Sequence, residues 1–222
     1  MNINKHLILL FSVLFFLFAV SVSSGCFRKN ESDVKSVVRN ELDQLKNLDS
    51  ETTQKYIPYT ELFPDATENT DLTDEINETF SLFFRKFNYK ISDVIVGTAN
   101  HSATVSVKLT TIDSKVLARD FKAELLRTQI TESAQAQKGN IKDSSRSLEA
   151  HYLILNHLLN TNDYDTAETD CNIQLVNTGN DKKEKWKIQR TNSLEDDLVG
   201  GLIADLANPD ILSPEDTLTV YQ

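Results

Sequence analysis

The first twenty-six residues constrain this chain more than any other stretch, because they decide where it folds. Met1–Cys26 opens with a polar segment that carries one formally charged side chain, Lys5. An apolar run of sixteen residues follows from Leu7 to Val22, interrupted only by two serines, and small residues then lead to Cys26. A short basic region, an apolar region and small residues before a cleavage site are the layout of a secretory signal peptide. The rest of the chain is therefore predicted to fold after export.

The end of this stretch resembles the lipobox of bacterial lipoproteins, in which a small residue and a glycine precede an invariant cysteine. Here the matching residues are Ser24, Gly25 and Cys26. The resemblance implies cleavage between Gly25 and Cys26 and a diacylglyceryl group on Cys26. Ser23 departs from the family pattern, which usually has leucine three places before the cysteine. Because two acyl chains suffice for stable attachment, the protein is expected to be lipid-anchored at the extracytoplasmic face of the cell membrane.

Two alternatives to the lipoprotein interpretation remain open. The apolar run is shorter than the about 20 residues that a spanning helix needs, yet an uncleaved membrane anchor would use the same stretch. An ordinary signal cleavage would instead release a soluble protein. The lipoprotein interpretation is favoured because the chain contains only one other cysteine, Cys171, so that a chance cysteine at position 26 would be a rare coincidence.

Charge and cysteine content limit the partners and the source of stability. Cleavage before Cys26 leaves 197 residues, which is the size of one domain. The mature chain would carry 22 basic and 33 acidic side chains, a formal charge of −11. Nucleic acid demands a basic surface, and so do anionic lipid headgroups, so neither is an expected partner. With Cys26 lipidated, Cys171 has no partner for an intramolecular disulfide and is expected to be a buried apolar residue.

Apolar residues at steps of three and four predict helices along much of the mature chain. The predicted starts are Ser32, Asp49, Thr73, residue 114, Ser147 and Ser193. Ser32 and Thr73 are expected to cap their helices, and Ser193 with Asp196 resembles a capping box. The first apolar stripe is expected to run from Val34 to Leu48. The helix after Thr73 holds four phenylalanines in eight residues, which predicts the core helix.

The last predicted helix contains two adjacent glycines, Gly200 and Gly201. Each costs about 1 kcal/mol relative to alanine inside a helix. The pair therefore predicts either the close approach of another backbone or a kink.

Alternating apolar and polar residues predict two β-hairpins. In the first, Tyr89, Ile91 and Ile95 are expected on one side, followed by a clean alternation over residues 103–111. In the second, residues 167–176 precede a glycine-containing turn and a returning strand with Trp186. Acidic residues such as Glu168 are expected to face the lysines of that returning strand, adding about 0.2–1 kcal/mol per pair.

These elements predict an α+β domain over residues 32–207, with a four-stranded curved antiparallel sheet covered by helices. A signal peptide over 1–25 and a lipidated tether over 26–31 would precede it, and a flexible acidic tail over 208–222 would follow. The element order, and the ending from Trp186 to the Gly200–Gly201 helix, resemble nuclear transport factor 2-like or cystatin-like domains of Firmicutes-type lipoproteins. The resemblance implies a fold and a location, but no chemistry, because those families lack an assigned activity.

The mature sequence contains no motif that carries a cofactor or a metal. No glycine-rich phosphate loop is present, and the three mature histidines, His101, His151 and His157, lack metal-ligand spacing. A nucleophilic pair of Cys171 and His151 is conceivable, but isolated buried thiols are usually inert. No cofactor and no metal are therefore expected.

Three function classes follow from these observations. The first is a non-catalytic, lipid-anchored module that binds a protein or an envelope component. The second is a small-molecule carrier with an apolar pocket near Tyr152, Cys171 and Trp186. The third is a hydrolase or isomerase-like enzyme that uses a cavity inside the cone of the sheet, since one scaffold can host all three. The mostly apolar inward faces of the strands favour binding over acid–base chemistry.

Overall fold

A computed structural model describes seven stretches of the chain. They are residues 30–56, 62–63, 66, 72–97, 101–136, 147–179 and 184–212. The predicted signal peptide, the lipidation site and most of the predicted tail lie outside these residues. The chain divides into two compact units. Unit 1 consists of Met1–Arg39, Asp93–Val105 and Ile173–Gln189, and unit 2 of Asn40–Ser92, Ser106–Asn172 and Arg190–Gln222.

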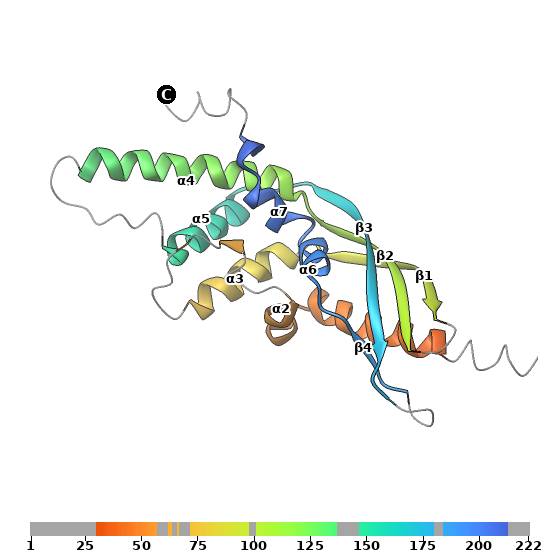
Figure 1. Cartoon of the computed structure of the whole chain (residues 1–222). Coiled ribbons are helices and arrows are strands. Elements are labelled where there is room, and N and C mark those ends of the chain that lie inside the picture. Colours follow the sequence, from red (N-terminus) through yellow and green to blue (C-terminus); the bar gives the residue numbers. More distant parts are fainter. Residues whose placement is uncertain are drawn as a thin grey trace, which may run out of the picture. The chain divides into compact units, whose positions relative to one another are not determined.

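The described chain is an α+β protein with one four-stranded sheet (Figure 1). After a helix over residues 30–46, the helices are α2 (Ser50–Tyr56), α3 (Thr73–Phe84), α4 (Ser114–Ala136), α5 (Leu148–Thr161), α6 (Asn192–Leu198), α7 (Leu202–Ala207) and the short 3-10 helix η2 (Pro209–Ile211). The strands are β1 (Asn88–Val96), β2 (Ser102–Ile112), β3 (Thr166–Asn177) and β4 (Trp186–Ile188). Their order in the sheet is β1-β2-β3-β4, antiparallel and not closed into a barrel, which confirms the predicted fold class at this level.

The helix over residues 30–46 confirms the first predicted stripe except at its ends. Val34, Val38, Leu42 and Leu45 are almost completely buried. Ser32 does not cap this helix, because the chain is already helical at Asn30. Leu48 leaves the stripe: it has a φ of 63° and is 42% exposed, just after the last helical turn. A left-handed residue at this position is a common way to end a helix.

Unit 1 contains the hairpin of β3 and β4. Leu175 pairs with Ile188 and Asn177 with Trp186, and the Thr178 amide donates to the Lys185 carbonyl at 2.8 Å. The buried apolar residues of this unit are Val34, Val38, Ala103, Val105, Ile173, Leu175 and Trp186. The predicted pairs of acids with the lysines of the returning strand are wrong, because β4 is only three residues long and pairs with the end of β3.

The acidic residues of β3 belong to unit 2, and their partner lies in the same unit. Glu168 and Asp170 contact Lys108 of β2 at 3.1 and 3.8 Å. All three side chains are largely exposed. The pKa of Lys108 is raised mainly by its hydrogen bond to Glu168, and further by the negative charges of Glu168 and Asp170. The cross-strand charge pairing therefore exists, but between β2 and β3.

The side-chain alternation of β1 changes face once. Ser92 and Asp93 are both exposed, and beyond them Ile95 is 60% exposed while Val94 and Val96 are partly buried. The prediction that Ile95 shares a face with Tyr89 and Ile91 is therefore wrong. A shift of one residue turns every later side chain to the other face of a strand.

Unit 2 contains the aromatic core that the sequence predicts. Phe80, Phe83 and Phe84 of α3 are buried, as is Phe87 after it, and Phe84 lies 5.5 Å from Phe83 and 5.2 Å from Phe87 between ring centroids. α3 packs against α5, and the Thr79 hydroxyl donates to the Asn156 side chain. α4 in turn packs against α5 and α7, and Figure 1 shows these helices side by side.

The sequence predicts that both glycines lie inside one helix. In the structure they separate α6 from α7 instead. Gly200 and Gly201 have φ values of 65° and 90°, a conformation that side chains with a Cβ atom rarely adopt. The predicted close approach of another backbone is not confirmed: the atom nearest to a Cβ on Gly200 would be the Thr111 side-chain hydroxyl oxygen, at 2.2 Å, and the Ile112 carbonyl oxygen would lie at 3.5 Å. The Ser114 hydroxyl is within hydrogen-bond distance, 2.6 Å, of both the Gly200 carbonyl and the Asp205 carboxylate.

Two further helix starts differ from the predictions. α6 is capped by Thr191, whose hydroxyl accepts from the Leu194 amide at 3.1 Å, so Ser193 lies inside the helix. α3 begins at Thr73 itself, with Leu72 before it. α5 starts where predicted, and Ser147 caps it by accepting from the Ala150 amide at 3.1 Å, a role that the sequence analysis does not assign to it. A polar residue near a helix start predicts the helix well, but it does not fix the capping position.

Candidate functional site

The candidate site of unit 2 begins with two stripes on α4. Arg119, Ala123 and Arg127 are four residues apart, and so are Asp120 and Glu124. Residues four apart lie one above the other on a helix, so each set forms a row along the axis. One row places a small residue between two arginines, and the other places two carboxylates beside it.

The end of α5 faces these stripes and is tied to them by hydrogen bonds. The helix ends at Asn162, whose amide donates to the Leu158 carbonyl at 3.0 Å. The Asn162 side-chain amide donates to the Tyr164 hydroxyl at 3.0 Å, and that hydroxyl is 3.1 Å from a carboxylate oxygen of Asp120. The hydrogen bond between Tyr164 and Asp120 therefore joins the segment just after α5 to α4.

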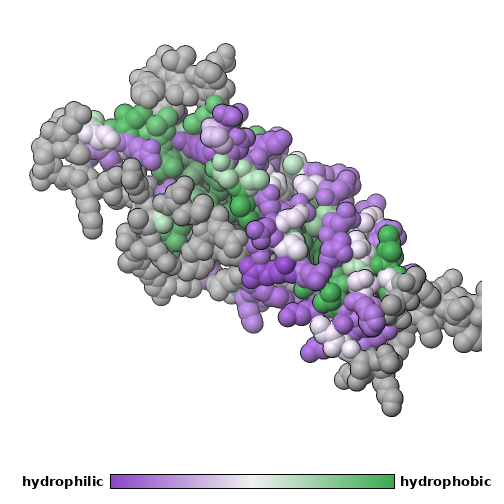
Figure 2. Space-filling view, in the orientation of Figure 1, coloured by the Kyte–Doolittle hydropathy of each residue, from purple (hydrophilic) through white to green (hydrophobic). Residues whose placement is uncertain are grey.

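A hollow of about 370 Å³ lies between the two helices. Its lining residues are Arg119, Asp120, Ala123, Glu124, Arg127, Leu158 and Asn162. Ala123 has only a methyl side chain, so the arginines on either side of it border open space. The volume is within the usual range of small-molecule sites, about 300–1,000 Å³. In Figure 2 the surface over α4 and α5 shows both hydrophilic and hydrophobic residues.

Each arginine of the hollow is held by a neighbouring carboxylate. Arg119 donates through Nε and Nη2 to one oxygen of Asp120, at 3.3 and 3.1 Å, and Arg127 donates through Nη1 to Glu124 at 3.1 Å. The arginine side chains are 44% and 51% exposed. A guanidinium group has five N–H donors, so each arginine keeps donors beyond those used by its carboxylate.

Tyr164 acts as a hydrogen-bond donor at this site over the whole physiological range. Burial raises its pKa to about 12, and the nearby negative charge of Asp120 adds to the effect. The phenol therefore stays protonated. Asp120 then accepts from Tyr164 on one oxygen and from Arg119 on the other. This carboxylate has partners on both oxygens and serves to orient Arg119.

The three residues of the predicted apolar pocket are buried in different surroundings. Tyr152 of α5 is fully buried, with its ring 5.4 Å from that of Phe63. Cys171 of β3 is 2% exposed and lies beside Asp197. Trp186 belongs to unit 1 and donates through its ring N–H to Glu184 at 3.2 Å. None of the three lines the hollow, so the apolar pocket stays a prediction.

Cys171 and His151 have separate partners. Burial raises the pKa of the Cys171 thiol to about 12, and the nearby Asp197 carboxylate raises it further. A thiol in this state is a poor nucleophile. The His151 ring stacks on Phe63 and Phe121 at 4.8 and 5.7 Å, and its Nδ1 lies 2.7 Å from the Ser147 carbonyl.

His151 should make the stability of the protein depend on pH. Burial lowers its pKa below the ordinary value of 6.5, and the Ser147 carbonyl opposes this only in part. The unfolded chain therefore takes up the proton first on acidification, so stability is complete above about pH 6.5 and falls as the pH drops toward the folded pKa. In His151→Phe the free energy of unfolding, measured by urea denaturation, should fall less steeply between about pH 7 and pH 5.

A second histidine on the same helix provides the control. His157 is exposed, so His157→Gln should keep the wild-type pH profile. Equal slopes in wild type and His151→Phe would show that His151 is not the group responsible.

Metal-ligand clusters and membrane-spanning helices are both absent from the described residues. No group of three or more histidine, cysteine or acidic side chains there could hold a metal ion. No helix in the same stretches is long and apolar enough to cross a membrane.

Comparison of the chain with protein-family models, with curated proteins and with solved structures finds no match.

The hollow is not predicted from the sequence, because the sequence predictions concern metal ligands, nucleophiles and apolar pockets. Its signal in the sequence is the repeat of Arg119, Ala123 and Arg127 on a helix of low amphipathicity.

Proposed function

We propose that the mature chain is a lipid-anchored, extracytoplasmic binding module without catalytic activity, and that the hollow between α4 and α5 is its ligand site. One observation carries the proposal: two half-exposed arginines border a hollow of about 370 Å³, and each is oriented by its own carboxylate. Holding a polar side chain in place before a ligand arrives reduces the entropy that binding would cost.

The chemistry of the lining favours binding over catalysis. Asp120 accepts hydrogen bonds on both oxygens, and Tyr164 stays protonated because its pKa is about 12. Tyr164, which borders Asp120 rather than the hollow itself, cannot act as a general base near neutral pH with such a pKa, and Asp120 is engaged by two donors that hold it in place. Arginine, which stays charged at any physiological pH, recognises ligands but does not exchange protons.

The location belongs to the same proposal and rests on the residues before the described part of the chain. The lipobox-like end at Gly25–Cys26 supports a lipid anchor, and the resemblance to nuclear transport factor 2-like or cystatin-like lipoprotein domains agrees with a four-stranded antiparallel sheet with helices. The partner is then a component outside the membrane, either a small molecule or part of a larger envelope component.

Replacing Cys26 with alanine should keep export but abolish lipid attachment. The apolar run from Leu7 to Val22 is unchanged, while the only atom able to carry the diacylglyceryl group is lost. Metabolic labelling with a tagged fatty acid measures the result directly. Equal label in wild type and Cys26→Ala would contradict the anchor, and Cys171→Ala is the matched control that should keep the full label.

The binding site is tested separately, by filling the hollow. A panel of small organic anions, organic cations and neutral sugars is added to wild type and to Ala123→Trp, and melting temperatures are compared. A ligand of the folded state raises the melting temperature. At least one class should do so in wild type and fail to do so in Ala123→Trp. A panel without effect, or with equal effects in both proteins, would refute the hollow as a ligand site.

A further inference from the structure

We infer that the hollow between α4 and α5 takes a small dicarboxylate, with one carboxylate on Arg119, the other on Arg127 and the chain between them over Ala123 and Leu158. The inference rests on the proposed function, because it names the ligand class of the same site. The arguments concern the spacing of the arginines, their remaining donors, the middle of the hollow and the balance of charge.

The spacing of the two arginines sets the length of the ligand. They are eight residues apart on one helix, which corresponds to about 12 Å along the axis at 1.5 Å per residue. Ala123 lies midway and leaves the space between them open. One compact anion such as inorganic phosphate would contact only one end. A ligand with an anionic group at each end of a short chain uses both.

The donors that remain on each arginine suit a carboxylate. Arg119 contacts Asp120 along its Nε side, so both Nη1 hydrogens remain. Arg127 contacts Glu124 through Nη1, so its Nε and Nη2 donors remain. Two parallel N–H groups of a guanidinium match the two oxygens of a carboxylate, which gives short and directional hydrogen bonds. Each arginine thus keeps donors for a ligand carboxylate beyond those that its own carboxylate uses.

The middle of the hollow is better suited to methylene groups than to polar ones. Its floor includes the methyl group of Ala123, and Leu158 is 8% exposed. The Asn162 side-chain amide also lines the hollow, but it already donates to Tyr164. A slim aliphatic chain would cover the apolar surface of Ala123 and Leu158, and the polar surface of the hollow would be left to the two carboxylate ends of the ligand and to water.

Two sources of negative charge oppose the binding of an anionic ligand, the acidic residues of the lining and the net charge of the chain. Neither is strong enough to prevent binding. The lining also contains Asp120 and Glu124, but each of these charges is matched by its arginine, so the lining has no net charge. The whole chain has a formal charge of −10. At physiological salt that field is screened over about 8 Å, whereas a contact at hydrogen-bond distance is not. A cationic ligand would find both carboxylates already paired.

Isothermal titration calorimetry on the full chain tests the inference with defined probes. The probes are suberate, an eight-carbon dicarboxylate, octanoate, its monocarboxylate counterpart, and octylammonium. Suberate should bind most tightly. Arg119→Gln and Arg127→Gln should each weaken suberate binding by roughly tenfold, because each removes one charge-assisted pair. Lys115→Gln, which removes an exposed charge from the first turn of the same helix, should leave the affinity unchanged.

The results separate the ligand class from the site. Octanoate binding as tightly as suberate, or an arginine substitution without effect, would overturn the dicarboxylate inference. If suberate does not bind while another probe class stabilises wild type but not Ala123→Trp, the binding function stands and the ligand class is wrong. Circular dichroism of each variant confirms that it is folded, and Arg127→Lys, which keeps the charge but loses the fork, should bind suberate more weakly than wild type.

Discussion

Replacing Gly200 with alanine should lower the free energy of unfolding by about 3 kcal/mol, the sum of a strained backbone and an overpacked core. The added Cβ would lie 2.2 Å from the Thr111 hydroxyl oxygen, and Thr111 is 1% exposed. The φ of 65° adds strain that any side chain with a Cβ atom would meet. Urea denaturation followed by circular dichroism measures the change.

The neighbouring glycine separates the two causes. A Cβ on Gly201 would have its nearest contact at an ordinary 3.7 Å, although its φ is 90°. Gly201→Ala should therefore cost only the backbone strain, about 1–2 kcal/mol. Thr111→Ala removes the oxygen that the new methyl group would meet, so Gly200→Ala should cost less in that background. Equal losses for Gly200→Ala and Gly201→Ala would show that the contact with Thr111 does not matter.

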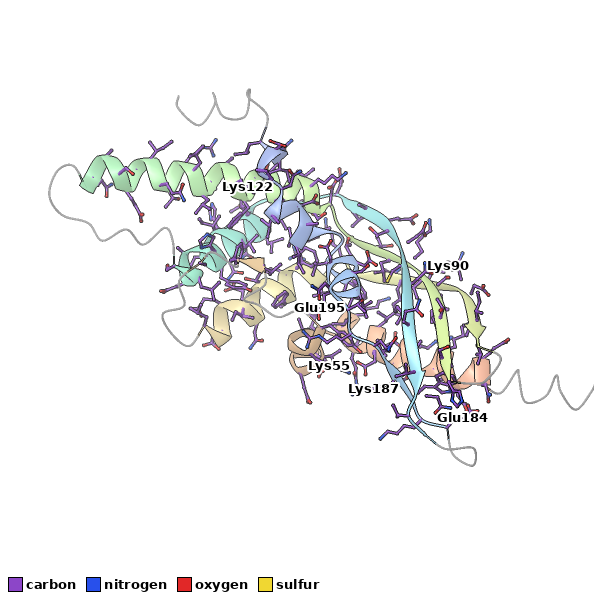
Figure 3. The ribbon with its side chains drawn as sticks, in the orientation of Figure 1. Lys55, Lys90, Lys122, Glu184, Lys187 and Glu195 are labelled. Atoms are coloured by element: carbon purple, nitrogen blue, oxygen red, sulfur yellow. The ribbon has the colours of Figure 1, made fainter. Side chains whose placement is uncertain are left out.

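Removing Arg190 should be comparably damaging, because it leaves a buried carboxylate without its cation. Glu195 of α6, labelled in Figure 3, is 4% exposed and pairs with Arg190, which lies just before the helix in the sequence. Breaking a buried pair costs about 3–5 kcal/mol. Arg190 is itself 45% exposed, so water can replace part of its interaction. Arg190→Met is therefore expected to lose about 2–3 kcal/mol in urea denaturation.

A double variant tests whether the lost charge pairing is the cause. Arg190→Met with Glu195→Met removes both charges, and buried pairs replaced by apolar residues are often close to neutral. The double variant should therefore recover most of the loss. The exposed pair of Lys108 and Glu168 is the matched control, and Lys108→Met should leave stability nearly unchanged. If the double variant is as unstable as Arg190→Met, the lost free energy of unfolding comes from packing of the arginine stem and not from the charge pair.

The elements that the sequence predicts correctly are those with a strong apolar period. The phenylalanines of α3 and the alternation of β2 and β3 are buried as expected, because burial of apolar surface determines both the pattern and the packing. The start of α5 at about Ser147 is also correct. The end of α4 at Ala136 is harder to predict, since its last turns carry few apolar residues from which a period could be read.

The errors occur where one residue changes the outcome. A one-residue shift at Ser92–Asp93 turns Ile95 outward, and a glycine pair divides a helix that would otherwise satisfy the period. The partner of Glu168 depends on the length of β4, which no local pattern specifies. The hollow depends on which residues of α5 face Ala123. This is a tertiary contact that a single sequence does not reveal. The arginine repeat alone would have suggested an ordinary solvated face.

The helix over residues 30–46 lies close in sequence to the proposed anchor, so the tether between the lipid and the domain would be short. The chain is helical from Asn30, only four residues after Cys26, and four extended residues span at most about 14 Å. A domain tied to the bilayer at that length stays in a thin layer beside the lipid headgroups. If the chain is cleaved as proposed, its formal charge would be −11, which would keep it from lying flat on anionic lipid, since the repulsion reaches about 8 Å at physiological salt. The protein would therefore meet its ligands at the membrane surface. The supply of ligands would depend on which molecules cross or leave the bilayer.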